Sequence, residues 1–229
     1  MRHQLDPAIV RIANGAGTAA GLGVLVGEEM ILTCAHVVRD ALGLKETPAE
    51  PPAADLRLDF PLAEGDTARA GRVYLWRPEL DVAVLTVDDH LPLAVRPIAF
   101  VTADDLWGHP FRAFGFPKDR AGGVYVTGVM RGPQAHPWLQ IDGSPGGYQI
   151  EPGFSGSPVW DETLEGVVGL VTRADPKAGV RAAYVIPTPV LIQAWSDLAA
   201  ASRPPSPYRG LAAFRAADTG NFYGRETTT

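Results

Sequence analysis

The chain has 229 residues, of which 46% are hydrophobic and 20% are charged, so it can bury a packed core and wholesale disorder is excluded. Acidic residues outnumber basic ones by 26 to 20, giving a net charge of −6, and without a cluster of Lys and Arg a nucleic-acid-binding surface is not expected. The single cysteine, Cys34, excludes an intramolecular disulfide and points to a reducing compartment.

The N-terminal sequence and the hydropathy pattern bear on location. Residues 1–7 (MRHQLDP) contain no apolar stretch typical of a signal peptide. No segment approaches the length of apolar sequence that spans a bilayer. We therefore expect a cytoplasmic protein that makes no membrane contact.

Short apolar or alternating runs, separated by turns rich in glycine (25) and proline (21), predict an all-β fold. Residues 46–55 and 142–147 are expected to be loops. Two sets of about six strands suggest a pair of antiparallel barrels or a sandwich. The expected strands lie at 8–12, 21–26, 30–34, 56–60, 73–75 and 82–87, and then at 111–116, 124–130, 138–141, 158–160, 166–172 and 181–186.

One helix is predicted, over residues 188–201. Thr188 is placed to cap it, Pro189 occupies the first turn, and Leu191, Trp195 and Leu198 fall on one face at helical spacing. After Ser202 the sequence RPPSP is typical of a stiff linker. Residues 208–229 are too short to bury a core of their own.

Three segments carry candidate catalytic side chains. His36 ends the apolar run 32–36, which we expect to be a strand, Asp81 precedes the strand 82–87, and Ser155 lies in the turn GFSGSP at 153–158. Each alone has an ordinary structural interpretation, as a strand-end histidine, a turn aspartate and a Gly-Ser turn. A metal pair of Cys34 and His36 lacks two further ligands, and a Cys34 nucleophile would sit where the core should be.

Taken together, the three residues indicate acyl transfer. A serine nucleophile needs a base to take its proton and a carboxylate to orient that base. It also needs backbone N–H groups that converge on the oxyanion, which flanking glycines allow.

With these motifs the chain resembles the trypsin-like (chymotrypsin-fold) serine peptidases, especially the bacterial branch that includes the high-temperature-requirement proteases. The matching stretches are 21–26, 31–38, 80–85, 152–158 and 166–170. The resemblance implies two perpendicular Greek-key barrels, at about 8–95 and 96–187, followed by the C-terminal helix 188–201. His36 would then be general base and later general acid, Asp81 would orient it, and Ser155 would attack, with the N–H groups of Gly153 and Ser155 as oxyanion hole. No metal and no cofactor is implied.

Two departures from the family pattern bear on activation and specificity. Phe154 stands where the secreted members have an aspartate, and the chain has no Ile-Val-Gly-Gly start, so activation by N-terminal cleavage is not expected. Gln149 matches the residue at the base of the primary pocket, and because it is not an acid, cleavage after Arg or Lys is not supported. Glu151 is close in sequence, but the sequence does not tell which way its side chain points. Thr172, Arg173 and Ala174 match the segment that forms the wall of the pocket in this family. Three interpretations of Arg173 are open: it narrows the cleft, it favours acidic substrate side chains, or it is a solvated surface arginine.

The tail has a second resemblance. Residues 207–211, Phe214, Asp218 and 222–226 look like the leading segment of STAND-type NTPases, although the chain contains no G-x-x-x-x-G-K-[ST] motif. Residues 203–229 are therefore expected to be a linker and the start of a truncated NTPase region. This implies an N-terminal effector of a larger bacterial conflict or antiphage-defence protein, whose partners are a protein or peptide substrate and C-terminal NTPase and sensor domains.

Two other functions remain open: a catalytically silent protease-fold adaptor, and a housekeeping quality-control protease. The second is not favoured, because nothing in the sequence resembles the peptide-binding domain that usually follows such enzymes.

Overall fold

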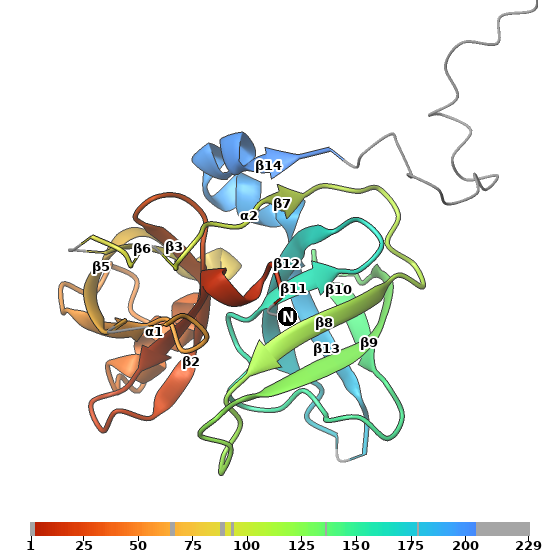
Figure 1. Cartoon of the computed structure of the whole chain (residues 1–229), viewed down its shortest axis with the longest axis horizontal. Coiled ribbons are helices and arrows are strands. Elements are labelled where there is room, and N and C mark those ends of the chain that lie inside the picture. The colour runs from red at the N-terminus through yellow and green to blue at the C-terminus, as the bar shows by residue number, and fades with distance from the viewer. Residues whose placement is uncertain are drawn as a thin grey trace, which may run out of the picture.

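The strands of the first half close into a barrel, as expected. The computed structural model describes residues 3–64, 67–87, 90–92, 94–135, 137–177 and 179–204. The barrel, red to yellow in Figure 1, has the strand order β1-β2-β3-β6-β5-β4. Its strands are β1 (Ile9–Ala13), β2 (Ala19–Leu25), β3 (Met30–Thr33), β4 (Leu56–Asp59), β5 (Arg69–Arg77) and β6 (Val82–Val87).

The strands of the second half close into a second antiparallel barrel, green to blue in Figure 1. The order is β11-β8-β9-β10-β13-β12, and pairing of β11 with β12 completes the ring. These strands are β8 (Pro110–Gly115), β9 (Val124–Pro133), β10 (Leu139–Gly143), β11 (Pro158–Asp161), β12 (Gly166–Ala174) and β13 (Ala182–Pro187). The expected chymotrypsin-like fold is thus confirmed.

Two short strands were not predicted. β7 (Phe100–Val101) pairs in parallel with β12, and β14 (Ser202–Arg203) pairs in parallel with β7. Each has two residues, too few for a period-two pattern to be read from the sequence. The expected linker therefore begins with a residue, Arg203, that is part of a sheet.

The expectation that a strand runs on to His36 is wrong. β3 ends at Thr33, the last residue that pairs with both β2 and β6. The carbonyl of Cys34 then accepts the N–H of Val37 (3.1 Å), and the chain turns into the short helix α1 (Ala35–Ala41). The β-branched Val37 and Val38 favoured a strand, but burial of both on the inner face of α1 outweighs that preference.

The C-terminal helix is shorter than expected. α2 spans Thr188–Ala194, the chain is extended at Trp195 (φ −141°, ψ 98°), and a 3₁₀ helix covers Ser196–Ala201. Thr188 does not cap α2, because its hydroxyl donates to the Val167 carbonyl (3.5 Å). Leu191, Trp195 and Leu198 are nevertheless all buried, as the pattern predicts.

The described chain also contains two 3₁₀ helices that were not predicted, and one expected loop is shorter than predicted. These helices, Asp6–Ala8 and Pro78–Leu80, precede β1 and β6. The expected loop at 142–147 begins only at Ser144, because Asp142 and Gly143 pair with β9 as the end of β10. None of the described helices is long and apolar enough to cross a membrane.

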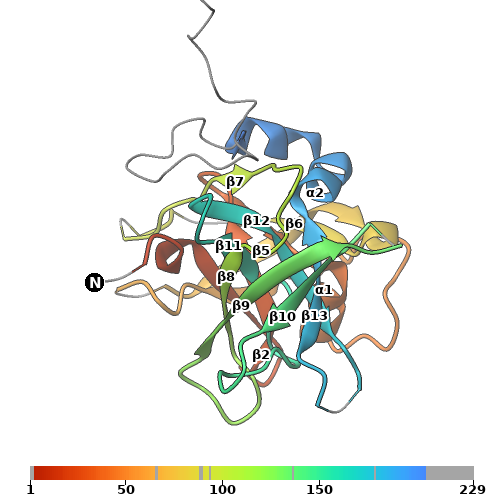
Figure 2. The ribbon, with the colours of Figure 1, turned by 90° about the vertical axis from the view of Figure 1, so that its right-hand side faces the viewer.

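The two barrels are joined by packing and by the N-terminal segment. The largest buried apolar cluster fills the first barrel and continues through Phe114 and Trp160 of the second. Asp6 accepts a hydrogen bond from the Tyr125 hydroxyl (2.6 Å), and the His3 ring meets the Trp160 ring edge-on at 5.0 Å. The described N-terminal segment, red in Figures 1 and 2, accordingly reaches from the first barrel to the second.

Candidate functional site

His36 and Asp81 form a tight pair. Asp81 lies between the 3₁₀ helix Pro78–Leu80 and β6, in the left-handed region (φ 56°) that aspartate tolerates better than most residues. Its carbonyl accepts the Ala35 N–H (3.1 Å), and its Oδ1 accepts the backbone N–H of His36 (3.0 Å). The His36 Nδ1 lies 2.8 Å from Oδ2 and 2.9 Å from Oδ1. Asp81 therefore fixes both the first turn of α1 and the imidazole ring.

Thr172 completes the surroundings of Asp81. The buried Thr172 donates from Oγ1 to Asp81 Oδ2 (2.8 Å). Burial by itself raises the pKa of Asp81, but the hydrogen bonds from His36 and Thr172 outweigh it and lower that pKa below its ordinary value. Asp81 is thus ionised at neutral pH, which places the proton of neutral His36 on Nδ1 and leaves Nε2 as the acceptor.

Ser155 is held from both barrels. Its carbonyl accepts the Leu22 N–H of β2 (2.8 Å), while its neighbour Gly156 donates to the Val171 carbonyl of β12 (2.7 Å). A Cβ on Gly156 would lie 1.9 Å from the Leu22 carbonyl oxygen, and one on Gly21 would lie 2.8 Å from the Ser155 carbonyl oxygen. These two positions require glycine because the first barrel approaches the serine turn so closely.

Thr172 links the two halves of the site. The Ser155 hydroxyl donates to the Thr172 carbonyl (3.1 Å), and the Thr172 hydroxyl donates to Asp81. The structure therefore brings His36, Asp81 and Ser155 to one place between the barrels. The serine hydroxyl has to leave the Thr172 carbonyl before an imidazole can take its proton.

The turn before Ser155 has the geometry of a type II β-turn. The Phe154 N–H donates to the Glu151 carbonyl (3.2 Å), Pro152 occupies the second position, and Gly153 occupies the third with φ +107°. A Cβ on Gly153 would lie 2.2 Å from the Phe116 carbonyl oxygen, so glycine is required there as well. Within the described part of the chain, the N–H groups of Gly153 and Ser155 donate to no protein acceptor and remain available to a ligand.

Phe154, which stands where the secreted members of the family have an aspartate, supports the turn by apolar packing. Its side chain is fully buried and lies against Gly115, with the Tyr148 ring at 6.4 Å. The turn is thus supported by an apolar anchor. Glu151 is half-buried and accepts the Tyr148 hydroxyl (2.8 Å), a bond that raises the pKa of that phenol.

Three residues that were expected to line the substrate site differ in exposure and in hydrogen bonding. Gln149 donates from Nε2 to the Val180 carbonyl (2.9 Å), so its amide is tied to the chain before β13. Ala174 is half-buried and pairs with Ala183 across β12 and β13. Arg173 is exposed, and its guanidinium lies over the ring of Trp138 at 4.4 Å. Trp138 was not a predicted site residue, because the sequence does not give the register that brings it to Arg173.

Cys34 lies beneath this site. Its side chain is fully buried and its Sγ is 3.5 Å from the Val171 carbonyl oxygen, so its expected place in the core is confirmed. Ligand atoms of Cys34, His36 and Asp81 all lie within 4.8 Å of one another, which adds Asp81 to the metal pair considered from the sequence. Burial first, and the charge of Asp81 second, raise the pKa of Cys34, and a neutral thiol is a poor metal ligand. The arrangement is better described as a hydrogen-bonded His–Asp pair above a buried thiol.

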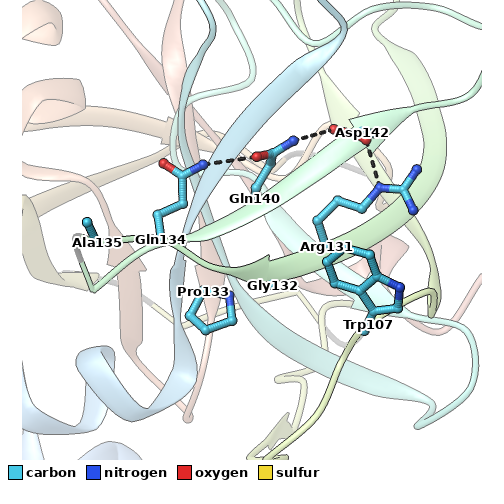
Figure 3. Close-up of a pocket in the computed structure, with 8 residues that line it drawn as sticks. All are labelled: Trp107, Arg131, Gly132, Pro133, Gln134, Ala135, Gln140 and Asp142. Carbon is cyan, nitrogen blue, oxygen red and sulfur yellow. Dashed lines mark hydrogen bonds and ion pairs between the residues drawn. The ribbon is translucent and has the colours of Figure 1, made fainter.

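A separate hollow of about 530 Å³ lies on the outside of the second barrel (Figure 3). A chain of hydrogen bonds runs along it from Gln134 to Gln140 to Asp142, which also pairs with Arg131. None of the candidate catalytic residues lines this hollow.

Solved structures with this fold include bacterial serine proteases. The serine endoprotease of Yersinia pestis matches with a TM-score of 0.63 and 20% identity over 85% of this chain, which spans 64% of the Yersinia protein. The Rv3671c protease of Mycobacterium tuberculosis, in an inactive form, matches with a TM-score of 0.61 and 19% identity, over 85% of this chain and 90% of the protease. A serine-to-alanine mutant of Rv3671c, also in an inactive form, matches with a TM-score of 0.62 and 20% identity, over 86% of this chain and 88% of the mutant protease. No protein of curated function shows significant similarity to the sequence.

The family assignment comes from the sequence itself. The model of the trypsin-like peptidase domain matches residues 21–170, which include His36, Asp81 and Ser155 and most of both barrels. The segment that resembles a STAND NTPase, 207–226, lies outside the described residues. The chain therefore belongs to the trypsin-like peptidase domain family, a family of serine protease hydrolases.

Proposed function

We propose that this domain is a serine endopeptidase in which Ser155 is the nucleophile, His36 the general base and Asp81 the residue that orients it. The observation that carries the proposal is the double engagement of Thr172, which hydrogen-bonds Ser155 through its carbonyl and Asp81 through its hydroxyl. Two hydrogen bonds through this one residue thus link the serine to a carboxylate that is itself bonded to the histidine.

The proposed reaction follows from the positions of donors and acceptors. Ser155 Oγ attacks the scissile carbonyl carbon while His36 Nε2 takes its proton, and the Asp81 carboxylate stabilises the resulting imidazolium. The N–H groups of Gly153 and Ser155 donate to the oxyanion, and each such donor lowers the barrier by about 2.7–4 kcal/mol. His36 then protonates the leaving amine, and water, activated by the same imidazole, hydrolyses the acyl-enzyme.

The end of β12 supplies a place for the substrate backbone. β11 pairs with β12 only over residues 166–170, so beyond Val171 the described part of β12 pairs with β13 alone. An open strand edge beside a nucleophile suits an extended peptide, which can add to it by main-chain hydrogen bonds. Thr172, Arg173 and Ala174 are the proposed contacts on this edge, with Gln149 at the base of the primary pocket.

Proteolysis of an unfolded protein such as casein tests this proposal. The wild type is expected to generate new N-termini, and both Ser155→Ala and His36→Ala to lose this activity. Because triad members act as a unit, the double variant should lose no more than either single one. Multiplicative losses would show that Ser155 and His36 act independently and would contradict the mechanism.

A catalytically silent adaptor remains the second candidate. One observation favours it: the Ser155 hydroxyl is bonded to the Thr172 carbonyl, so its proton is directed away from His36. An adaptor would bind peptides equally well as wild type and as Ser155→Ala, and it would cleave none of them. An enzyme held at rest by this bond would cleave once activated.

We also propose that the domain, residues 1–202, is the cytoplasmic N-terminal effector of a larger STAND NTPase with a role in bacterial defence. This rests on the sequence resemblance of residues 203–229, and the single cysteine agrees with a reducing compartment. The partners would be NTPase and sensor domains. A Walker motif in the reading frame shortly beyond Thr229, with nucleotide-dependent proteolysis by the longer protein, is the expected result; a longer frame without that motif would contradict it.

A further inference from the structure

Arg173 is an exposed cation that directly follows Thr172, the residue whose carbonyl accepts the Ser155 hydroxyl. Ser155 donates to the carbonyl of Thr172, and Arg173 follows directly on the open end of β12. Its guanidinium is held 4.4 Å from the ring centroid of Trp138 and 5.7 Å from that of Tyr184. The two rings are themselves 6.4 Å apart.

Two adjacent strands and the residue just before a third build this stack. Arg173 on β12 pairs with Tyr184 on β13, which pairs with Gln140 on β10, two residues after Trp138. Leu139, Ala183 and Val185, the chain neighbours of the two aromatic residues, are buried in the barrel core, so the backbone that carries both rings is anchored. An arginine stacked on two rings is pre-oriented, and it loses less conformational entropy on binding than a free side chain does.

Within the described part of the chain, no carboxylate forms an ion pair with Arg173. Other arginines form ion pairs, among them Arg11 with Asp59, Arg72 with Asp55 and Arg131 with Asp142. The acid nearest to Arg173 in the sequence, Asp175, accepts hydrogen bonds from the Tyr184 hydroxyl (3.0 Å) and the Lys177 N–H (2.9 Å).

We propose that Arg173 determines specificity by binding an Asp or Glu side chain of the substrate; this inference rests on the proposed peptidase function. A guanidinium lying flat on an aromatic ring keeps its N–H edges free, and these match a carboxylate in a two-point hydrogen bond. Because Arg173 follows Thr172 on the same strand edge, the acidic side chain would belong to a residue of the extended peptide near the scissile bond.

Paired peptides test the inference. Internally quenched peptides share one scissile sequence and carry Glu or Gln at each position in turn. At one position, wild type should cleave the Glu peptide about 10- to 100-fold faster in kcat/KM than the Gln peptide, as expected for a charge-assisted hydrogen bond. Arg173→Gln should abolish this preference, and Arg173→Glu should reverse it toward a Lys peptide. Lys177→Gln removes the same charge four residues away, outside the stack, and should keep the preference.

A second readout separates this inference from the proposed function. Ser155→Ala, which cannot turn over, should bind a fluorescein-labelled Glu peptide more tightly than its Gln partner in fluorescence anisotropy, and Arg173→Gln in that background should equalise them. If wild type cleaves casein but Glu and Gln peptides react alike, the inference fails and the peptidase proposal stands. If wild type cleaves nothing while Ser155→Ala binds the Glu peptide through Arg173, the peptidase proposal fails and the acid-binding site stands. Equal binding of both peptides overturns the inference.

Discussion

Thr172→Val isolates the hydrogen bond that links the serine segment to Asp81. Valine has nearly the same shape as threonine, but it cannot donate to Asp81 Oδ2, which now receives a bond of 2.8 Å. Asp81 would keep its two bonds from His36, through the backbone N–H and Nδ1. A buried hydrogen bond to a charged group contributes about 1.5–3 kcal/mol, so we expect the free energy of unfolding at pH 7 to fall by that amount.

The pH dependence of this loss identifies its cause. Because the pKa of Asp81 is lowered in the folded protein, its interactions stabilise the fold above the unfolded pKa of about 3.9, and this stability is lost as the pH falls through the lower folded pKa. Removing one donor raises the folded pKa toward the unfolded value. The difference between Thr172→Val and wild type should therefore shrink progressively below about pH 4.

Urea unfolding at pH 7 and at about pH 3.5, followed by the fluorescence of the five tryptophans, measures the difference. Thr33→Val is the matched control, because the Thr33 hydroxyl donates to a neutral acceptor, the Leu22 carbonyl (2.5 Å). Its cost, about 1 kcal/mol, should be the same at both pH values. If the Thr172→Val loss is equally independent of pH, the bond to an ionised Asp81 does not stabilise the fold.

Three further predictions concern the surroundings of the site. Cys34 should not react with iodoacetamide in the native protein and should react on unfolding, because burial shields the thiol and raises its pKa; rapid native labelling in mass spectrometry would contradict this. Gly153→Ala should reduce the rate of labelling by a fluorophosphonate at least about 100-fold, since a Cβ would meet the Phe116 carbonyl oxygen at 2.2 Å; an unchanged rate would refute the oxyanion-turn geometry. Tyr125→Phe should lower the free energy of unfolding by about 1.5–3 kcal/mol by removing the bond to Asp6, and a cycle with Asp6→Asn should show that the two losses are not additive.

The candidate catalytic residues were proposed from signals that are local in the sequence. Ser155 is flanked by glycines that the structure requires, and Asp81 stands directly before an apolar strand. The local structure at His36 could not be predicted, because Val37 and Val38 favour a strand and only the end of pairing at Thr33 turns the chain into α1. Tertiary contacts decide such boundaries, so a residue can be expected in a strand and lie in a helix.

The surroundings of Arg173 depend on information that the sequence does not carry. Arg173 is 35 residues from Trp138 and 11 residues from Tyr184 in the sequence. The three side chains meet only when β10, β12 and β13 pair in one particular register. β12 also contains an irregularity between Val171 and Arg173, which changes the face on which the following side chains lie. A bulge of this kind leaves no distinct pattern in the sequence, so the contacts of Arg173 with Trp138 and Tyr184 could not be predicted.

Reaction with a fluorophosphonate probe shows whether Ser155 is an activated nucleophile. Intact-mass and peptide mass spectrometry should find a single adduct on Ser155 in the wild type, no adduct in Ser155→Ala, and an unchanged adduct in Ser196→Ala, which removes an exposed hydroxyl elsewhere. His36→Ala should suppress the reaction at Ser155. A wild type that labels no faster than Ser155→Ala would show that Ser155 is not an activated nucleophile.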